Sequence, residues 1–120
     1  MSASPPAVRR GVRLFNAGRY LSAQQVWEEA WREAPPEERA FLEALVQLAG
    51  ALHLRTRRGA LRGAVQLLSQ ALIQLDDYRP TTHGIDVARL VDDFAAYAES
   101  VKASGRPHRL LDRLRIPRIH

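Results

Sequence analysis

The stretch that decides the fold is FLEALVQLAGALHL, residues 41–54. If these residues form a helix, apolar side chains lie on almost every side of it. A helix that is apolar nearly all round is covered by neighbours on several sides. The sequence therefore predicts a central helix from Pro36 to about Arg57. Its expected core side chains are Leu45, Leu48, Ala49 and Leu52.

Helical periodicity continues on both sides of this segment. Linkers are short, which favours antiparallel neighbours, and no segment shows the alternation of a half-buried strand. Asp86 is expected to cap the last helix, with Ile85 and Leu90 flanking it as a hydrophobic staple. The sequence predicts an all-α fold, a compact five-helix assembly of antiparallel helical hairpins. The other expected helices run from Pro6 to Ala17, Tyr20 to Ala34, Leu61 to Tyr78 and Val87 to Ser104.

Length and composition fit one globular domain. Of the 120 residues, 46% are hydrophobic and 26% charged, which is close to the average for proteins that fold on their own. We expect the helical domain to span residues 1–105 and a tail to span residues 106–120. The chain has no cysteine, so disulfides, thiol nucleophiles and thiolate metal sites are excluded.

The sequence also gives an expectation for location. Met1 to Pro6 lack the basic flank and apolar run of a signal peptide, and no stretch approaches the roughly 18 to 20 apolar residues of a membrane span. We therefore expect a cytoplasmic protein without a membrane partner.

The tail combines arginines with aliphatic residues. The chain has a net charge of +5, and residues 105–120 hold five arginines against one acid, so the rest is close to neutral. A free tail would leave its aliphatic side chains in water, so we expect it to pack on its own helices or on a second subunit. A short helical turn is expected around Leu110 to Leu114, followed by an extended end because of Pro117. The aliphatic residues are Leu110, Leu111, Leu114, Ile116 and Ile119.

A polar stripe on the central helix is the best candidate for a site. Glu43, Gln47, Gly50 and His53 follow one another at steps of four, three and three, so they share one face. With Glu28 of the preceding helix, Glu43 and His53 supply two carboxylates and an imidazole, which suit acid-base chemistry or metal binding. In a structural interpretation, these groups hydrogen-bond each other, or Glu43 and Gln47 mark the one solvent-exposed edge of the helix. The sequence favours the structural interpretation, and no metal is expected. The candidate polar cluster, including side chains expected to face the stripe from the preceding helix, is Gln24, Glu28, Trp31, Glu43, Gln47 and His53.

Basic residues gather where the central helix ends. Such a patch is typical of phosphate binding. The aromatic residues, however, belong to the core pattern and form no stacking platform among the arginines, which argues against nucleic-acid binding. The basic patch consists of Arg55, Arg57, Arg58 and Arg62.

Four motifs in order resemble a known family of bacteria and archaea. They are LFNAGRY (residues 14–20), VWEE followed by Trp31 (26–31), EER with Phe41 and Leu42 (37–42), and QLAGALH (47–53). Over residues 12–75 the chain resembles the domain-of-unknown-function family 309. The resemblance implies an all-helical fold and no established activity. It also implies that a His-Glu pair usual in the family is replaced here by Gln24 and Gln25.

These observations favour a non-catalytic protein-interaction or self-associating module, such as a homodimer, that needs no cofactor. Two other classes remain open. One is a small metal-dependent or acid-base hydrolase using Glu28, Glu43 and His53. The other is an accessory nucleic-acid binder.

Overall fold

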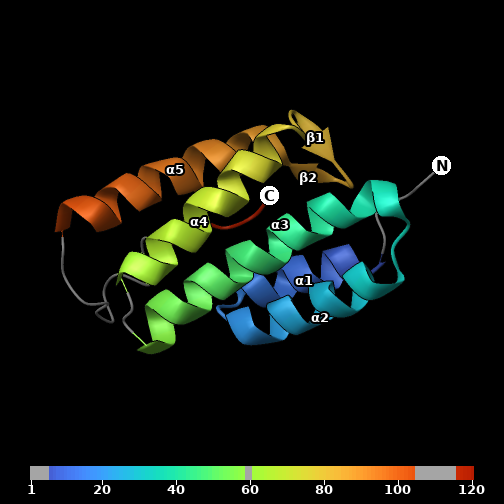
Figure 1. The fold of residues 1–120 in the computed structure, drawn as a ribbon, viewed down its shortest axis with the longest axis horizontal. Coiled ribbons are helices and arrows are strands. Elements are labelled where there is room, and N and C mark those ends of the chain that lie inside the picture. The colour runs from blue at the N-terminus through green and yellow to red at the C-terminus, as the bar shows by residue number, and fades with distance from the viewer. Residues whose placement is uncertain (1–5, 59–60, 105–115) are drawn as a thin grey trace.

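The computed structural model describes residues 6–58, 61–104 and 116–120, which form five α-helices and one short hairpin (Figure 1). This arrangement confirms the all-α prediction, and each helix lies within a few residues of its expected limits. None of the described helices is long and apolar enough to cross a membrane. In chain order the helices are α1 (Pro6–Asn16), α2 (Tyr20–Glu33), α3 (Pro36–His53), α4 (Leu61–Asp76) and α5 (Val87–Ser104).

Proline and glycine set the limits of the first three helices. Pro36 occupies the first turn of α3, where the missing N–H is no loss, and Glu37 and Glu38 lie at the positive end of the same helix. Gly18 follows α1 with a φ of 80°, a backbone conformation that other residues rarely adopt. Chain direction therefore reverses within a few residues, and α1, α2 and α3 lie antiparallel to their neighbours.

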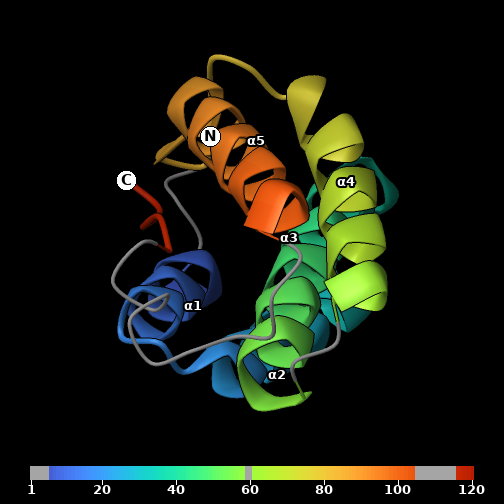
Figure 2. The ribbon, with the colours of Figure 1, turned by 90° about the vertical axis from the view of Figure 1, so that its left-hand side faces the viewer.

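Consecutive helices pack against one another around the molecule, α1 on α2, α2 on α3, α3 on α4 and α4 on α5. Figure 2 shows that this order curls, so that the first and last helices approach each other. Phe15 of α1 and Phe94 of α5 close the curl, with ring centroids 5.8 Å apart in an edge-to-face arrangement. The core lies inside the curl.

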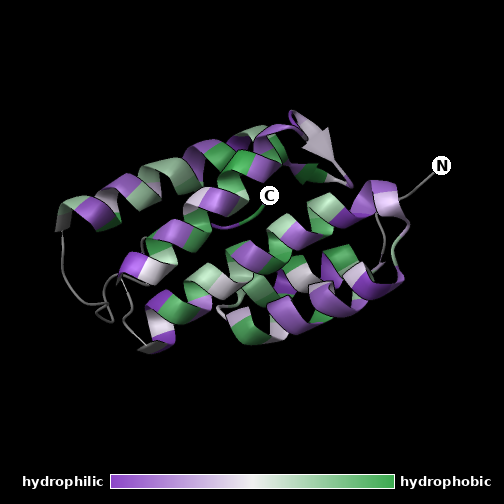
Figure 3. Ribbon diagram, viewed as in Figure 1, coloured by the Kyte–Doolittle hydropathy of each residue, from purple (hydrophilic) through white to green (hydrophobic). Residues whose placement is uncertain are grey.

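Helix α3 is the central element, as predicted. Its Leu45, Leu48, Ala49 and Leu52 side chains are all buried. The other helices alternate between hydrophilic and hydrophobic bands, as amphipathic helices do (Figure 3). The expectation that α3 is covered on several sides is confirmed.

The last turn of the central helix departs from the prediction. After His53 the chain continues as a π-helical turn, η1 (Leu54–Arg58), instead of an α-helix. The Thr56 hydroxyl donates a hydrogen bond to the Leu52 carbonyl at 2.7 Å, so its side chain bonds back to the preceding turn. The wider turn changes the directions in which the arginines of this segment point.

A two-stranded hairpin precedes α5, and the expectation that no strand occurs was wrong here. Strands β1 (Thr81–Thr82) and β2 (Ile85–Asp86) pair antiparallel. His83 and Gly84 form the loop with φ of 51° and 79°, and two positive φ values are typical of a type I′ turn. Two-residue strands are too short to show an alternating pattern in sequence.

The start of α5 confirms the predicted cap. The Arg89 backbone N–H donates to Asp86 Oδ1 at 3.0 Å, and Ile85 and Leu90 are both buried, as the staple requires. This cap fixes the angle at which the hairpin enters α5.

The described end of the chain packs on its own fold. Ile119 is 2% exposed, and its backbone N–H and C=O both bond to the Asn16 side chain at 2.8 Å. The Asp86 N–H donates to the His120 carbonyl at 2.7 Å. Residues 116–120 form neither a helix nor a strand. The helical turn predicted for residues 110–114 lies outside the described residues.

Candidate functional site

The predicted polar stripe does not converge on one point. Glu43 Oε1 accepts a hydrogen bond from Gln74 Nε2 of α4 at 3.2 Å. Glu43 therefore turns toward α4, whereas the sequence analysis expected it to face α2. The reason is that α3 lies between α2 and α4, so a stripe on its outer side is within reach of both neighbours.

Gly50 marks the middle of the stripe, where three helices meet. A Cβ built on Gly50 would lie 3.1 Å from Gln24 Nε2 of α2 and 3.4 Å from Leu67 Cδ2 of α4. Gln24 thus faces the stripe as expected. The absent side chain at position 50 lets α2 and α4 both approach α3 closely.

Two amide oxygens, one on α3 and one on α4, lie in unusual surroundings. Gln47 Oε1 and Gln74 Oε1 are buried, and neither has a hydrogen-bond partner among the described residues. Buried acceptors without partners are uncommon and costly. The stripe is therefore a partly satisfied polar seam between α3 and α4.

The remaining members of the cluster lie elsewhere. Trp31, near the end of α2, lies beside Arg39 of α3, whose guanidinium carbon is 5.8 Å from its ring centroid. Glu28 is half-buried on α2. Glu43 and His53 are ten residues apart on one helix, about 15 Å along its axis. The described residues thus do not bring Glu28, Glu43 and His53 into one catalytic site, nor do they group three or more potential metal ligands.

His53 instead lines a hollow of about 350 Å³ where α2 begins and α3 gives way to η1. Sequence reasoning named two of its residues, in separate clusters, and missed Arg19 and Ser22, which the turn after Gly18 brings to the rim. The lining residues are Gly18, Arg19, Tyr20, Leu21, Ser22, His53, Thr56 and Arg57.

The predicted basic patch is divided. Arg57 and Arg62 are exposed, but Arg55 is only 3% exposed, so it is not part of a solvent-facing patch. The side chain of Arg58 lies outside the described part of the structure. An arginine stem is long and apolar enough to be buried, and the π-helical turn directs Arg55 inward.

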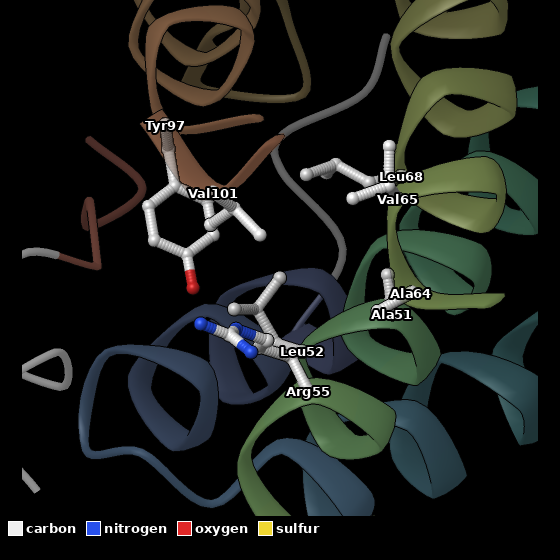
Figure 4. Close-up of a pocket in the computed structure, with 8 residues that line it drawn as sticks. All are labelled: Ala51, Leu52, Arg55, Ala64, Val65, Leu68, Tyr97 and Val101. Carbon is white, nitrogen blue, oxygen red and sulfur yellow. The ribbon is translucent and has the colours of Figure 1, made fainter. Parts of the chain in front are cut away.

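Arg55 occupies a small pocket between α3, α4 and α5. Figure 4 shows its guanidinium and the Tyr97 hydroxyl directed toward each other among Leu52, Leu68 and Val101. The open space is about 10 Å³, room for one water molecule at most. This pocket is therefore a packing feature and not a ligand site.

A different pattern of charge occurs between α4 and α5. Hydrogen bonds that the Arg79 guanidinium donates to Asp76 and to Asp92 raise the pKa of Arg79 above its ordinary value. Elsewhere His83 Nε2 lies 2.7 Å from Glu38 Oε1 and joins the hairpin to α3. Arg79 and His83 each have an acidic neighbour.

The outer face of α4 was not singled out by sequence reasoning. No charged residue occurs between Arg62 and Asp76, a span of more than three turns. Ile73 lies in this span and is 73% exposed. The signal is present in the sequence as a charge-free run from residue 63 to residue 75. The exposed or half-buried residues of this face are Gln66, Ser69, Gln70 and Ile73.

A comparison with protein families identifies the chain. The sequence model of a family described as Domain of unknown function (DUF309) matches residues 8–67. The chain belongs to this family. The match includes the polar stripe and ends within α4, before Ile73. A search among curated proteins finds no match.

Membership in DUF309 confirms the resemblance drawn from the motifs, and with it the description of the chain as an uncharacterised helical domain. Gln24 lies against Gly50 of α3. In this member, that position serves a contact between helices.

Proposed function

We propose that this DUF309 protein is a non-catalytic module that associates with a second copy of itself through the outer face of α4. One observation carries the proposal: Ile73 is 73% exposed on a helix that carries no charge from residue 63 to residue 75. Surface helices ordinarily carry charged side chains on their outer side. The centres of protein interfaces are depleted of charge.

The chemistry of this face favours a copy of itself over a charged partner. A symmetric dimer brings the same patch of both subunits together, so any charge on the patch would face a charge of the same sign on the other subunit. The α4 face has none. Its glutamines each carry a donor and an acceptor, so Gln66 and Gln70 complement the same residues of a second copy.

The experiment measures the mass of the full chain by size-exclusion chromatography with light scattering over a range of concentrations. We expect a dimer that dissociates on dilution. Ile73→Glu should give a monomer at concentrations where the unchanged protein is dimeric, because two carboxylates would be buried against each other.

Leu21→Glu is the matched control. Leu21 is the other large exposed hydrophobic side chain among the described residues, at 46%, and it lies on α2 outside the proposed interface. The Leu21→Glu variant should have the same mass as the unchanged protein at each concentration. A monomer at every concentration, or equal effects of both substitutions, would contradict self-association through α4.

A further inference from the structure

Three basic side chains from three parts of the chain surround the hollow at the start of α2. Arg19 comes from the turn after α1, His53 from the end of α3 and Arg57 from η1. Among the residues that the structure describes, no aspartate or glutamate lines the hollow. The fold therefore concentrates positive charge in a concave space instead of spreading it over a surface.

Arg19, His53 and Arg57 also lack the acidic neighbours that some other basic residues of the described ranges have. Arg79 is paired with Asp76 and Asp92, and Arg89 and Lys102 lie beside Asp93 and Glu99. Arg19, His53 and Arg57 have no ion pair or side-chain hydrogen bond with another residue of the described ranges. An anion in the hollow would bring together opposite charges where the free protein has only like ones.

Further donors lie at the same rim. The Ser22 side chain lines the hollow, and Arg19, at the cap position of α2, has only donors and does not cap the first turn of the helix. The first turn of a helix adds partial positive charge to the electrostatic effect of the side chains. Guanidinium groups are suited to binding two oxygens of a phosphate at once.

The size and remaining wall of the hollow indicate more than a bare anion. Its volume of about 350 Å³ is in the range of small-molecule sites and exceeds what one phosphate fills. Tyr20 and Leu21 form an apolar side of the wall. The Tyr20 ring is fixed edge-to-face on Phe15, with centroids 4.9 Å apart, so this side is preformed.

We infer that this hollow is a binding site for small phosphomonoesters. The phosphate lies between Arg19, Arg57 and His53, and the organic part lies against Tyr20 and Leu21. The divided arginine patch favours such a ligand over a nucleic acid, because Arg55 is buried and does not extend the basic surface along a backbone.

The test is an NMR titration of the full chain that follows backbone amide signals. The probes are inorganic phosphate, glycerol 3-phosphate, adenosine monophosphate and a mixed-sequence single-stranded oligonucleotide. We expect the two phosphomonoesters to shift the amides of Gly18 to Ser22 and of Thr56 and Arg57 in a saturable way. Inorganic phosphate should bind the same site about tenfold more weakly, because it makes no contact with the apolar wall.

Arg19→Ala and Arg57→Ala are the test variants, and Arg32→Ala is the matched control. All three arginines are exposed, so the fold should be retained, and Arg32 lies at the other end of α2. Each test variant should weaken binding of the phosphomonoesters by about tenfold or more, since a charge-assisted hydrogen bond is lost. Arg32→Ala should bind like the unchanged protein.

Four results would overturn the inference. The first is the absence of saturable shifts with either phosphomonoester, and the second is equal weakening of binding by Arg32→Ala. The third is inorganic phosphate that binds as tightly as the esters. The fourth is an oligonucleotide that binds more tightly than the esters, with a steep dependence on salt. The first three reject an ester site. The last assigns the basic residues to nucleic acid.

Discussion

Leu48 lies at the centre of the core, fully buried on α3. We expect Leu48→Ala to lower the free energy of unfolding by roughly 2 to 5 kcal/mol, through lost burial and the cavity left behind. Chemical denaturation measures this change. Leu21→Ala, at a side chain that is 46% exposed, is the control and should cost under about 1 kcal/mol. Similar costs for both would mean that Leu48 does not anchor the core.

Asp86 stabilises α5 through one hydrogen bond, from the Arg89 N–H to Oδ1. Asp86→Ala should lower the free energy of unfolding by about 1 kcal/mol, since a first-turn donor loses its acceptor. The control is Asp77→Ala, an exposed carboxylate whose side chain makes no hydrogen bond with the described residues. If denaturation midpoints of the two variants coincide, the cap contributes nothing.

At the residue scale, the sequence predicted what depends on near neighbours. The Asp86 cap and its staple involve residues within four positions, and both are present. The partner of Glu43 was not predictable, because Gln74 is 31 positions away and Gln24 is equally compatible with the spacing. Spacing places a residue on a helix face, but the packing of neighbouring helices decides which side chain meets it.

At the scale of elements, two glycines on helices have opposite roles. A Cβ at Gly11 of α1 would overlap the indole of Trp27, whose Nε1 donates to the Val8 carbonyl at 3.3 Å. At Gly63 of α4 no described atom lies within 4 Å of the same position. Gly11 therefore permits the close approach of α1 and α2, whereas Gly63 has no such contact.

These glycines give predictions of opposite sign. Gly11→Ala should lower the free energy of unfolding by about 1 to 3 kcal/mol, because the core is overpacked and the Trp27 hydrogen bond is strained. Gly63→Ala should raise it by up to about 1 kcal/mol, because alanine favours the helix. Thermal melting of the two variants, side by side, measures both. A stabilising effect at position 11 would show that α1 does not lie this close to α2.

The elements themselves differed in how far the sequence determined them. Long helices such as α5 have several turns of consistent apolar spacing, and their limits were predicted closely. The π-helical turn and the hairpin were not, because each depends on a few residues whose conformation tertiary contacts select. His83 and Gly84 lack the Asn-Gly or Asp-Gly pair that most often marks a two-residue hairpin. The hollow beside η1 was missed for the same reason.

At the scale of the whole molecule, the described end of the chain joins its beginning. Asn16 of α1 and Ile119 are 103 positions apart and share two hydrogen bonds, and the His120 carbonyl accepts from Asp86 beside α5. Residues 116–120 thus connect α1 to the hairpin that precedes α5. This position implies a closing role within one subunit.

The closing role is tested by Ile119→Ala. Ile119 is 2% exposed, and its truncation should lower the free energy of unfolding by roughly 2 kcal/mol through lost apolar burial, with a lower melting temperature. The mass measured by light scattering should not change, because the contacts are internal. Arg118→Ala, at an exposed neighbouring side chain, is the control and should change neither quantity. A loss of mass with Ile119→Ala would instead assign the end of the chain to the contact between subunits.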